Sequence, residues 1–261
     1  MAKAWVLVAL AACGSDAARP DAAIVEVDAR RDALGPDAMP PDAGPNLACL
    51  GQASSGTAAD PLPVTGKLFA IDHYQVTPLS GATVAVVLRA DDSILASDTT
   101  ASDGTFATNV TSHGDAVDAY FAITAAGFVA GRIDPVVRLT NDAHQLVVVA
   151  SEAEIGRWYA DAGVTYTPGM ATLIVAATDC DGLSLGTTTA MLSPTSALTY
   201  YDAVAQHWDP ALTASTNGFM LVTAPAATVT VTAHHETSTF PPHTIAAPAN
   251  TLTVANLPPE L

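Results

Sequence analysis

Positively charged side chains are scarce in this sequence. Its 261 residues include 9 Lys and Arg against 26 Asp and Glu, which gives a formal net charge of −17. A protein with this charge would repel phosphate backbones rather than release their counterions. Nucleic acid and anionic membrane surfaces are therefore poor candidate partners.

Aromatic residues are also few, at 6% of the chain, although 49% of the residues are hydrophobic. Much of this apolar content is Ala, accompanied by many Thr and Val. The mixture favours the short strands and turns of a β-sandwich over an enzyme with a deep pocket. A chain of this length allows one large domain or two modest domains.

Helical patterns are nearly missing as well. Alternating apolar residues between turn signals predict strands at residues 64–71, 82–89, 93–99, 105–110, 120–126 and 146–150. The single convincing helix covers residues 151–163, where Ser151 and Glu154 form a capping box. Ile155, Trp158 and Tyr159 fall on one face of that helix.

The first residues resemble a bacterial lipoprotein signal. MAKAW supplies one positive charge, VLVALAA a short apolar core, and LAAC ends at Cys13. The lipobox that this stretch resembles implies removal of residues 1–12 and acylation of Cys13, so that the lipid anchors the protein to a membrane. Gly14, where some inner-membrane lipoproteins have Asp, favours the outer membrane. The alternative is an ordinary cleaved signal whose cysteine is incidental.

Residues 13–60 predict a disordered tether rich in Pro, Ala and Asp. Pro-Asp-Ala recurs in this segment, which has few large apolar residues to bury. Such a segment cannot offset its own chain entropy and stays extended. It would lift the folded part of the protein away from the membrane.

The rest of the sequence repeats one order of features in two halves. PLSGATVAV, SDGTF and YFAITAAGF in the first half correspond to LSLGTTTAM, TNGFM and TVTVTAHHE in the second. A glycine before an apolar strand, followed by Asp-Gly or Asn-Gly and then Phe, resembles the carboxypeptidase regulatory-like domains. The resemblance covers most of residues 64–150 and, less regularly, residues 171–258.

This resemblance implies transthyretin-like β-sandwiches that act as accessory, spacer or recognition modules, with no reaction of their own. The expected fold is all-β, with tandem sandwiches at residues 61–150 and 170–261 and a helical linker at residues 151–169. The second copy departs from the family pattern because it has an insertion around residues 200–210.

One motif suggests an enzyme instead. GLSLG, residues 182–186, satisfies the G-x-S-x-G pattern of a hydrolase nucleophile elbow, with Ser184 as the nucleophile. The elbow requires a helix directly after the strand, and no helix is predicted there. Aligning Gly186 with Gly81 places Ser184 opposite Leu79 of the first half. We therefore interpret Ser184 as a turn residue, and a serine hydrolase is a distant alternative.

No metal and no cofactor are predicted. His234, His235, Glu236 and His243 lie close in sequence, but a metal site needs three or four converging ligands. Neighbouring residues of a strand point to opposite faces, so His234 and His235 cannot share a site. The acidic groups lack the spacing of a calcium loop. They are Asp91 and Asp92, Asp115 and Asp118, and Asp179 and Asp181.

The insertion in the second half contains three aromatic residues. Tyr200, Tyr201 and Trp208 could form a platform for sugars, which makes a carbohydrate-binding or adhesive module the alternative function. Packing at a strand edge explains the same residues equally well.

The chain has three cysteines. Acylation of Cys13 leaves Cys49 and Cys180 as an even pair in an oxidising compartment. The segment after Cys49 is long enough for a disulfide bond to reach the second sandwich, which would hold the two sandwiches together. The alternatives are a buried Cys180 with a Cys49 that is free or pairs between molecules.

Together these features predict a non-catalytic lipoprotein of the cell envelope that acts as a binding or spacer module. Its expected location is the outer membrane, facing the periplasm or the cell surface. Its expected partners are the membrane, through the lipid, and a surface glycan or protein.

Overall fold

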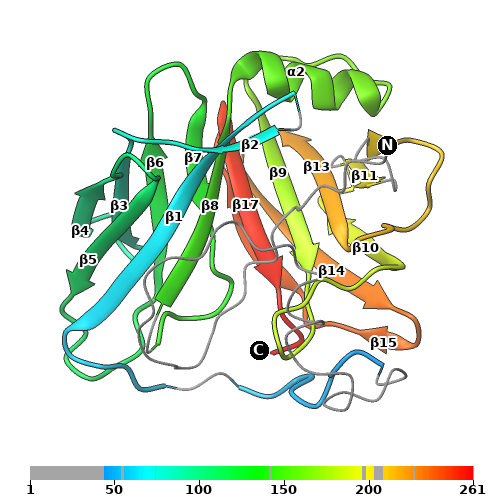
Figure 1. Cartoon of the computed structure of the whole chain (residues 1–261). Helices are drawn as coiled ribbons and strands as arrows, with labels where there is room; N and C mark the ends of the chain where they lie inside the picture. Colours follow the sequence, from blue (N-terminus) through cyan, green and yellow to red (C-terminus); the bar gives the residue numbers. More distant parts are fainter. Residues whose placement is uncertain are drawn as a thin grey trace, which may run out of the picture.

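The computed structural model describes residues 44–53, 56–73, 75–140, 143–195, 198–202, 208–225 and 227–260. Over these residues the protein consists mostly of β-strands in sandwich-like sheets, with one short helix (Figure 1), so the all-β prediction is confirmed. No helix in the described ranges is long and apolar enough to cross a membrane. The predicted signal and Cys13 lie outside the described residues.

The first half forms two sheets around a shared core. Its strands are β1 (Leu62–Asp72), β2 (Gln75–Pro78), β3 (Thr83–Leu88), β4 (Ile94–Thr99), β5 (Thr105–Val110), β6 (Ala119–Thr124), β7 (Ala130–Ile133) and β8 (Ala143–Ala150). The long strand β1 pairs in parallel with β8 on one edge and antiparallel with β5 and β2 on the other. In the facing sheet, β3 pairs with β4 and β6, and β6 pairs with β7, all antiparallel.

The second half also forms two sheets. Its strands are β9 (Met170–Ala177), β10 (Thr188–Ser193), β11 (Leu198–Asp202), β12 (Trp208–Asp209), β13 (Phe219–Pro225), β14 (Ala227–His235), β15 (Ser238–Thr239), β16 (His243–Ala247) and β17 (Thr251–Leu257). Strand β9 pairs in parallel with β17 and antiparallel with β13. Strand β14 pairs antiparallel with β10, β16 and β15.

The two halves repeat one pairing pattern. In the first half β1 lies between its parallel partner β8 and its antiparallel partner β5, and in the second half β9 lies between β17 and β13 in the same way. Likewise β3, β6 and β7 of the first half correspond to β10, β14 and β16 of the second. The repeat read from the sequence is therefore also a repeat of strand pairing.

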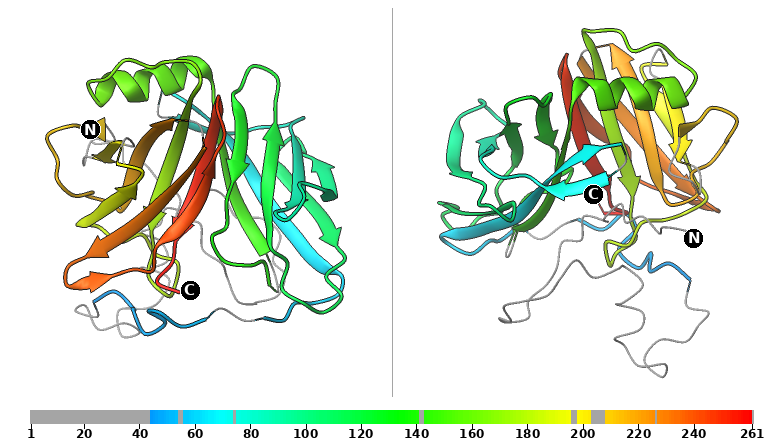
Figure 2. Two further views of the ribbon diagram at one scale, coloured as in Figure 1. Left: turned by 180° about the vertical axis from the view of Figure 1, so that it is seen from behind. Right: turned by 45° about the horizontal axis from the view of Figure 1, so that its top comes forward.

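The halves are not separate sandwiches, because one sheet runs through both. This sheet has nine strands in the order β12-β11-β13-β9-β17-β7-β6-β3-β4. Figure 2 shows β17, in red, between β9 and the green strands of the first half. Strand β17 pairs in parallel with β9 on one edge and with β7 on the other. The edges of β7 and β17, which would otherwise expose unpaired backbone groups, thus pair with each other.

The junction is buried on both faces of the shared sheet. Along β9, Ile174 and Ala176 belong to a core that contains the interior of the first sandwich and one face of α2 (Glu152–Asp161). The alternate residues Leu173 and Val175 belong to the core of the second sandwich. Because successive strand residues point to opposite faces, β9 serves both cores, and seven of its eight residues are buried.

Helix α2 lies across the upper end of the shared sheet in Figure 1. It begins as predicted at Ser151, whose Oγ accepts a hydrogen bond from the backbone N–H of Glu154 at 3.2 Å. Ile155, Trp158 and Tyr159 are buried, so the predicted apolar face is the one that packs on the sheet. Gly163, with φ +74°, ends the helical turn.

The Asp-Gly and Asn-Gly pairs of the repeat occupy equivalent turns. Gly104 has φ +81° and Gly218 has φ +89°, a backbone conformation that disfavours side chains. A Cβ atom at Gly104 would lie 2.5 Å from the Leu68 carbonyl oxygen, and one at Gly218 would lie 2.7 Å from that of Leu185. These turns lead to Phe106 and Phe219, which are both buried in the core that contains the interior of the first sandwich.

The end of the predicted tether is part of the folded structure. Residues 44–53 and 56–60, called the strap below, run along the lower side of both sandwiches in Figure 1. Leu47 packs against the core of the second sandwich and Ala58 against the core of the first. The folded region therefore starts earlier than the predicted boundary at residue 61.

Candidate functional sites

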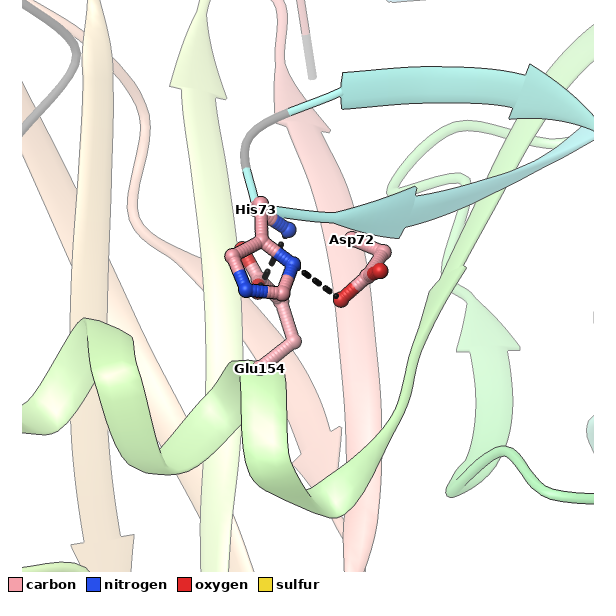
Figure 3. A group of neighbouring side chains, drawn as sticks. All are labelled: Asp72, His73 and Glu154. Carbon is pink, nitrogen blue, oxygen red and sulfur yellow. Dashed lines mark hydrogen bonds and ion pairs between the residues drawn. The ribbon is translucent and has the colours of Figure 1, made fainter.

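Asp72, His73 and Glu154 bring three potential metal ligands together (Figure 3). Asp72 ends β1, His73 occupies the turn that follows it with φ +48°, and Glu154 lies in the first turn of α2. One ligand atom from each residue lies within 4.8 Å of the others. Among the residues that the structure describes, this group alone has three His, Cys, Asp or Glu ligands so close together.

The Glu154 carboxylate is fully buried and engaged by three donors. It accepts hydrogen bonds from the backbone N–H of His73 at 2.8 Å and from Trp158 Nε1 at 3.1 Å. It also forms an ion pair with Arg157 Nη1. In the capping box predicted from the sequence this carboxylate would turn back to Ser151. It turns instead to the β1–β2 hairpin, which it fastens to the helix.

Arg157 supplies the positive charge of this group. Its Nη1 pairs with Glu154 and lies 3.6 Å from Asp72 Oδ1. His73 Nδ1 lies 3.0 Å from the same Asp72 oxygen, and this hydrogen bond is the main reason that the pKa of Asp72 is lowered. A guanidinium therefore already stands where a metal ion would be needed to neutralise the carboxylates, and the group is best described as an ionic latch.

A second charged network lies at the end of the first sandwich, beside β17. The buried Asp134 carboxylate accepts bonds from Arg89 Nη1 at 2.5 Å and Arg132 Nε at 3.1 Å. The guanidinium of Arg132 also lies 3.4 Å from the centre of the Tyr120 ring. Asp134 further donates its backbone N–H to the Val254 carbonyl at 2.8 Å. The network therefore reinforces the place where the two halves share a sheet.

Ser184 lies in a turn between β9 and β10, not at the start of a helix. It forms an isolated bridge with Thr178, and the Asp179 carboxylate accepts the N–H groups of Asp181 and Leu183 at 3.0 and 2.9 Å. The strand-to-helix geometry of a nucleophile elbow is missing at this turn.

The predicted aromatic platform does not form. Tyr201 is 8% exposed and belongs to the core of the second sandwich, where its hydroxyl accepts a bond from the Ala190 N–H at 3.1 Å. Trp208 is 5% exposed and belongs to the other core, against which the half-buried Tyr200 packs. Adjacent residues of β11 point to opposite faces of the sheet, so Tyr200 and Tyr201 cannot face one ligand. Residues 203–207 lie outside the described residues.

The histidines of the second half are held by separate partners. His234 Nδ1 lies 3.0 Å from Thr239 Oγ1, whereas His235 Nδ1 lies 2.9 Å from the Gly186 carbonyl oxygen. His243 Nε2 lies 3.2 Å from the Pro258 carbonyl oxygen, and burial lowers the pKa of its imidazole. They therefore fill structural positions at the lower end of the second sandwich.

Cys49 and Cys180 form a disulfide bond, with Cα atoms 5.9 Å apart. Around the bond, Asn46 accepts the Cys180 N–H with its carbonyl oxygen at 2.8 Å and donates its side-chain amide to Asp181 at 3.1 Å. The bond joins the strap to the turn that follows β9. It explains why residues predicted to be a tether are fixed to the second sandwich.

Comparisons with known proteins identify no family. No protein-family model and no curated protein match the chain. Similar solved structures include the Bacillus anthracis TIE protein, at 10% identity and a TM-score of 0.26, covering 75% of this chain and 34% of that one. The shaft pilin SpaA from Lactobacillus rhamnosus GG has 12% identity and a TM-score of 0.25, covering 76% of this chain and 98% of that one.

The full-length major pilin RrgB from Streptococcus pneumoniae has 8% identity and a TM-score of 0.27, covering 74% of this chain and 44% of that one. The chain thus spans about a third of the TIE protein and less than half of RrgB. Likenesses at these TM-scores support no statement about function. The carboxypeptidase regulatory-like relationship stays a prediction.

Proposed function

We propose that this protein is an exported lipoprotein whose two joined sandwiches form a non-catalytic binding or spacer module of the cell envelope. The observation that supports this most directly is the Cys49–Cys180 bond. Structural disulfides persist in oxidising compartments, and this one lies where the N-terminal segment meets the folded part. Acylation of Cys13 would then hold a rigid body on a tether of about 30 residues.

The contacts of the ionisable and nucleophilic side chains support a structural role for this protein rather than a catalytic one. The two most buried carboxylates among the described residues, Glu154 and Asp134, are paired with arginines and bonded to neighbouring elements. Ser184 lies in a turn without the helix that an elbow requires. The carboxylates of Glu154 and Asp134 therefore stabilise the fold.

Fractionation of Cys13→Ser tests the anchor. The unchanged protein should incorporate labelled fatty acid and sediment with outer membranes, whereas Cys13→Ser should lose the label and appear in the soluble fraction. Cys49→Ser is the matched control, because it removes a thiol and should keep the lipid. Retention of Cys13→Ser in membranes in detergent-free buffer would show that the anchor lies elsewhere.

A glycan array and a fluorophosphonate probe test the non-catalytic module. A pure spacer should bind no glycan, and Ser184 should not react with the probe. Covalent labelling that disappears in Ser184→Ala would overturn the non-catalytic proposal.

A further inference from the structure

The strap is attached to both sandwiches, but with bonds of different strength. To the second sandwich it is joined covalently through Cys49, and the Gly51 N–H donates to the Pro259 carbonyl at 2.8 Å. To the first sandwich it is attached without a disulfide bond, by hydrogen bonds and by the packing of Ala58. Ala58 N–H donates to the Gly114 carbonyl and Ala116 N–H to that of Gly56, both at 3.0 Å.

From the strap the chain continues directly into β1. Strand β1 has 11 residues and pairs with β2, β5 and β8. Without the covalent bond, tension on the N-terminal segment would load the strap's hydrogen bonds one after another and then reach Leu62 at the start of β1. Peeling of this kind is easy, because each hydrogen bond contributes only about 0.5–1.5 kcal/mol.

We infer that the Cys49–Cys180 bond diverts tension away from the first sandwich. Tension on the N-terminal segment passes at Cys49 into Cys180, which lies three residues beyond the end of β9. Strand β9 is held by β13 and β17 in the shared sheet. The chain between the two cysteines, including all of the first sandwich, is bypassed. The inference rests on the proposed tether, since only a tethered protein experiences such tension.

Single-molecule stretching of the full chain tests this device. Cys13→Ser is used throughout to remove the third thiol, and handles are attached to the two chain ends. Under oxidising conditions the folded part can release only the 81 residues after Cys180, an extension of about 290 Å at 3.6 Å per residue. Reduction under load should release the chain between the cysteines, which are separated by 131 in the sequence, for about 470 Å more.

The force at which the folded part begins to extend distinguishes two roles of the disulfide bond. It either carries tension past the first sandwich or only limits the length of chain that can be released. The double variant Cys49→Ser/Cys180→Ser should begin to extend at a lower force than the oxidised protein, with a short first step as the strap peels. Release of more than about 290 Å from the chain after Cys180 before reduction would overturn the inference. An unchanged first force after reduction would overturn it as well.

Two controls keep the result interpretable. If the double variant does not fold, reduction of the already folded oxidised protein under load gives the same comparison. The measurement uses unlipidated protein, so failure of the lipid anchor and failure of the tension bypass are distinguishable.

Discussion

Removing the Glu154 carboxylate should destabilise the protein far more than removing the carboxylate of Glu152 in the same turn of α2. Glu154 is 0% exposed and accepts bonds from the His73 N–H, Trp158 Nε1 and Arg157. In Glu154→Ala the first two donors lose their acceptor. The buried Trp158 Nε1 then costs about 1–3 kcal/mol, and the His73 N–H, in an exposed residue, costs less. Arg157, whose side chain is 34% exposed, can regain water and adds little. The expected loss in the free energy of unfolding is about 3–5 kcal/mol.

Glu154→Gln preserves the shape of the side chain and separates charge from volume. Its amide keeps one acceptor oxygen, so the expected loss is smaller, at about 2–4 kcal/mol. Glu152→Gln is the matched control, because it removes the same charge from the same helical turn at an exposed position. Its effect is limited to the helix dipole and should stay below about 1 kcal/mol.

Denaturant unfolding of the three variants gives the free energies, and amide and indole NMR signals of His73 and Trp158 report the bonds themselves. Both signals should shift in Glu154→Ala and stay in place in Glu152→Gln. If Glu154→Ala and Glu152→Gln lose equal stability, the latch between the β1–β2 hairpin and α2 does not exist as described.

Three further changes have expected outcomes. Asp134→Asn breaks a buried ion pair beside β17 and should cost about 3–5 kcal/mol in denaturant unfolding, against less than about 1 for the half-exposed Asp118→Asn. Gly218→Ala combines a left-handed φ with a 2.7 Å approach to a backbone oxygen and should lower stability by more than about 2 kcal/mol; Gly81→Ala, with φ +73° and no neighbour within 4 Å, should lose about 1. His243 has a pKa below its ordinary 6.5, so its neutral form stabilises the fold above that pH and the contribution is lost as pH falls. His243→Gln should flatten the fall in urea midpoint between about pH 7.5 and 5.5, and an unchanged slope would contradict the assignment.

Local chemistry made the turns and the helix predictable from the sequence. Ser151 marks the start of α2 because its side-chain oxygen accepts a bond from an N–H group that the helix leaves unpaired. Gly163 marks the end because glycine tolerates the positive φ at which the helix stops. Asp-Gly and Asn-Gly mark equivalent turns because glycine tolerates positive φ. The repeat was visible because both halves place these signals in the same order.

Long-range pairing was not predictable in the same way. An exposed edge strand and a strand paired with a distant one have the same alternation of apolar and polar residues. The sequences of β7 and β17 therefore do not predict that these two strands pair. The aromatic residues were ambiguous for a related reason. The sequence is compatible with a sugar platform or with packing at a strand edge, and the wide shared sheet offers two cores in which Tyr201 and Trp208 are buried. Glu154 was predicted only as part of a helix cap, because the hairpin that it fastens lies 81 residues earlier.

The position of β17 has a consequence for the order in which the molecule can be completed. Strand β17 follows every other strand in the sequence, yet it fills the gap between β9 and β7. During synthesis, the edge of β7 that pairs with β17 therefore stays uncovered until residues 251–257 have been made. An uncovered edge invites pairing with the same edge of another copy. The pairing of β17 with β7 thus removes an edge at which newly made chains could associate.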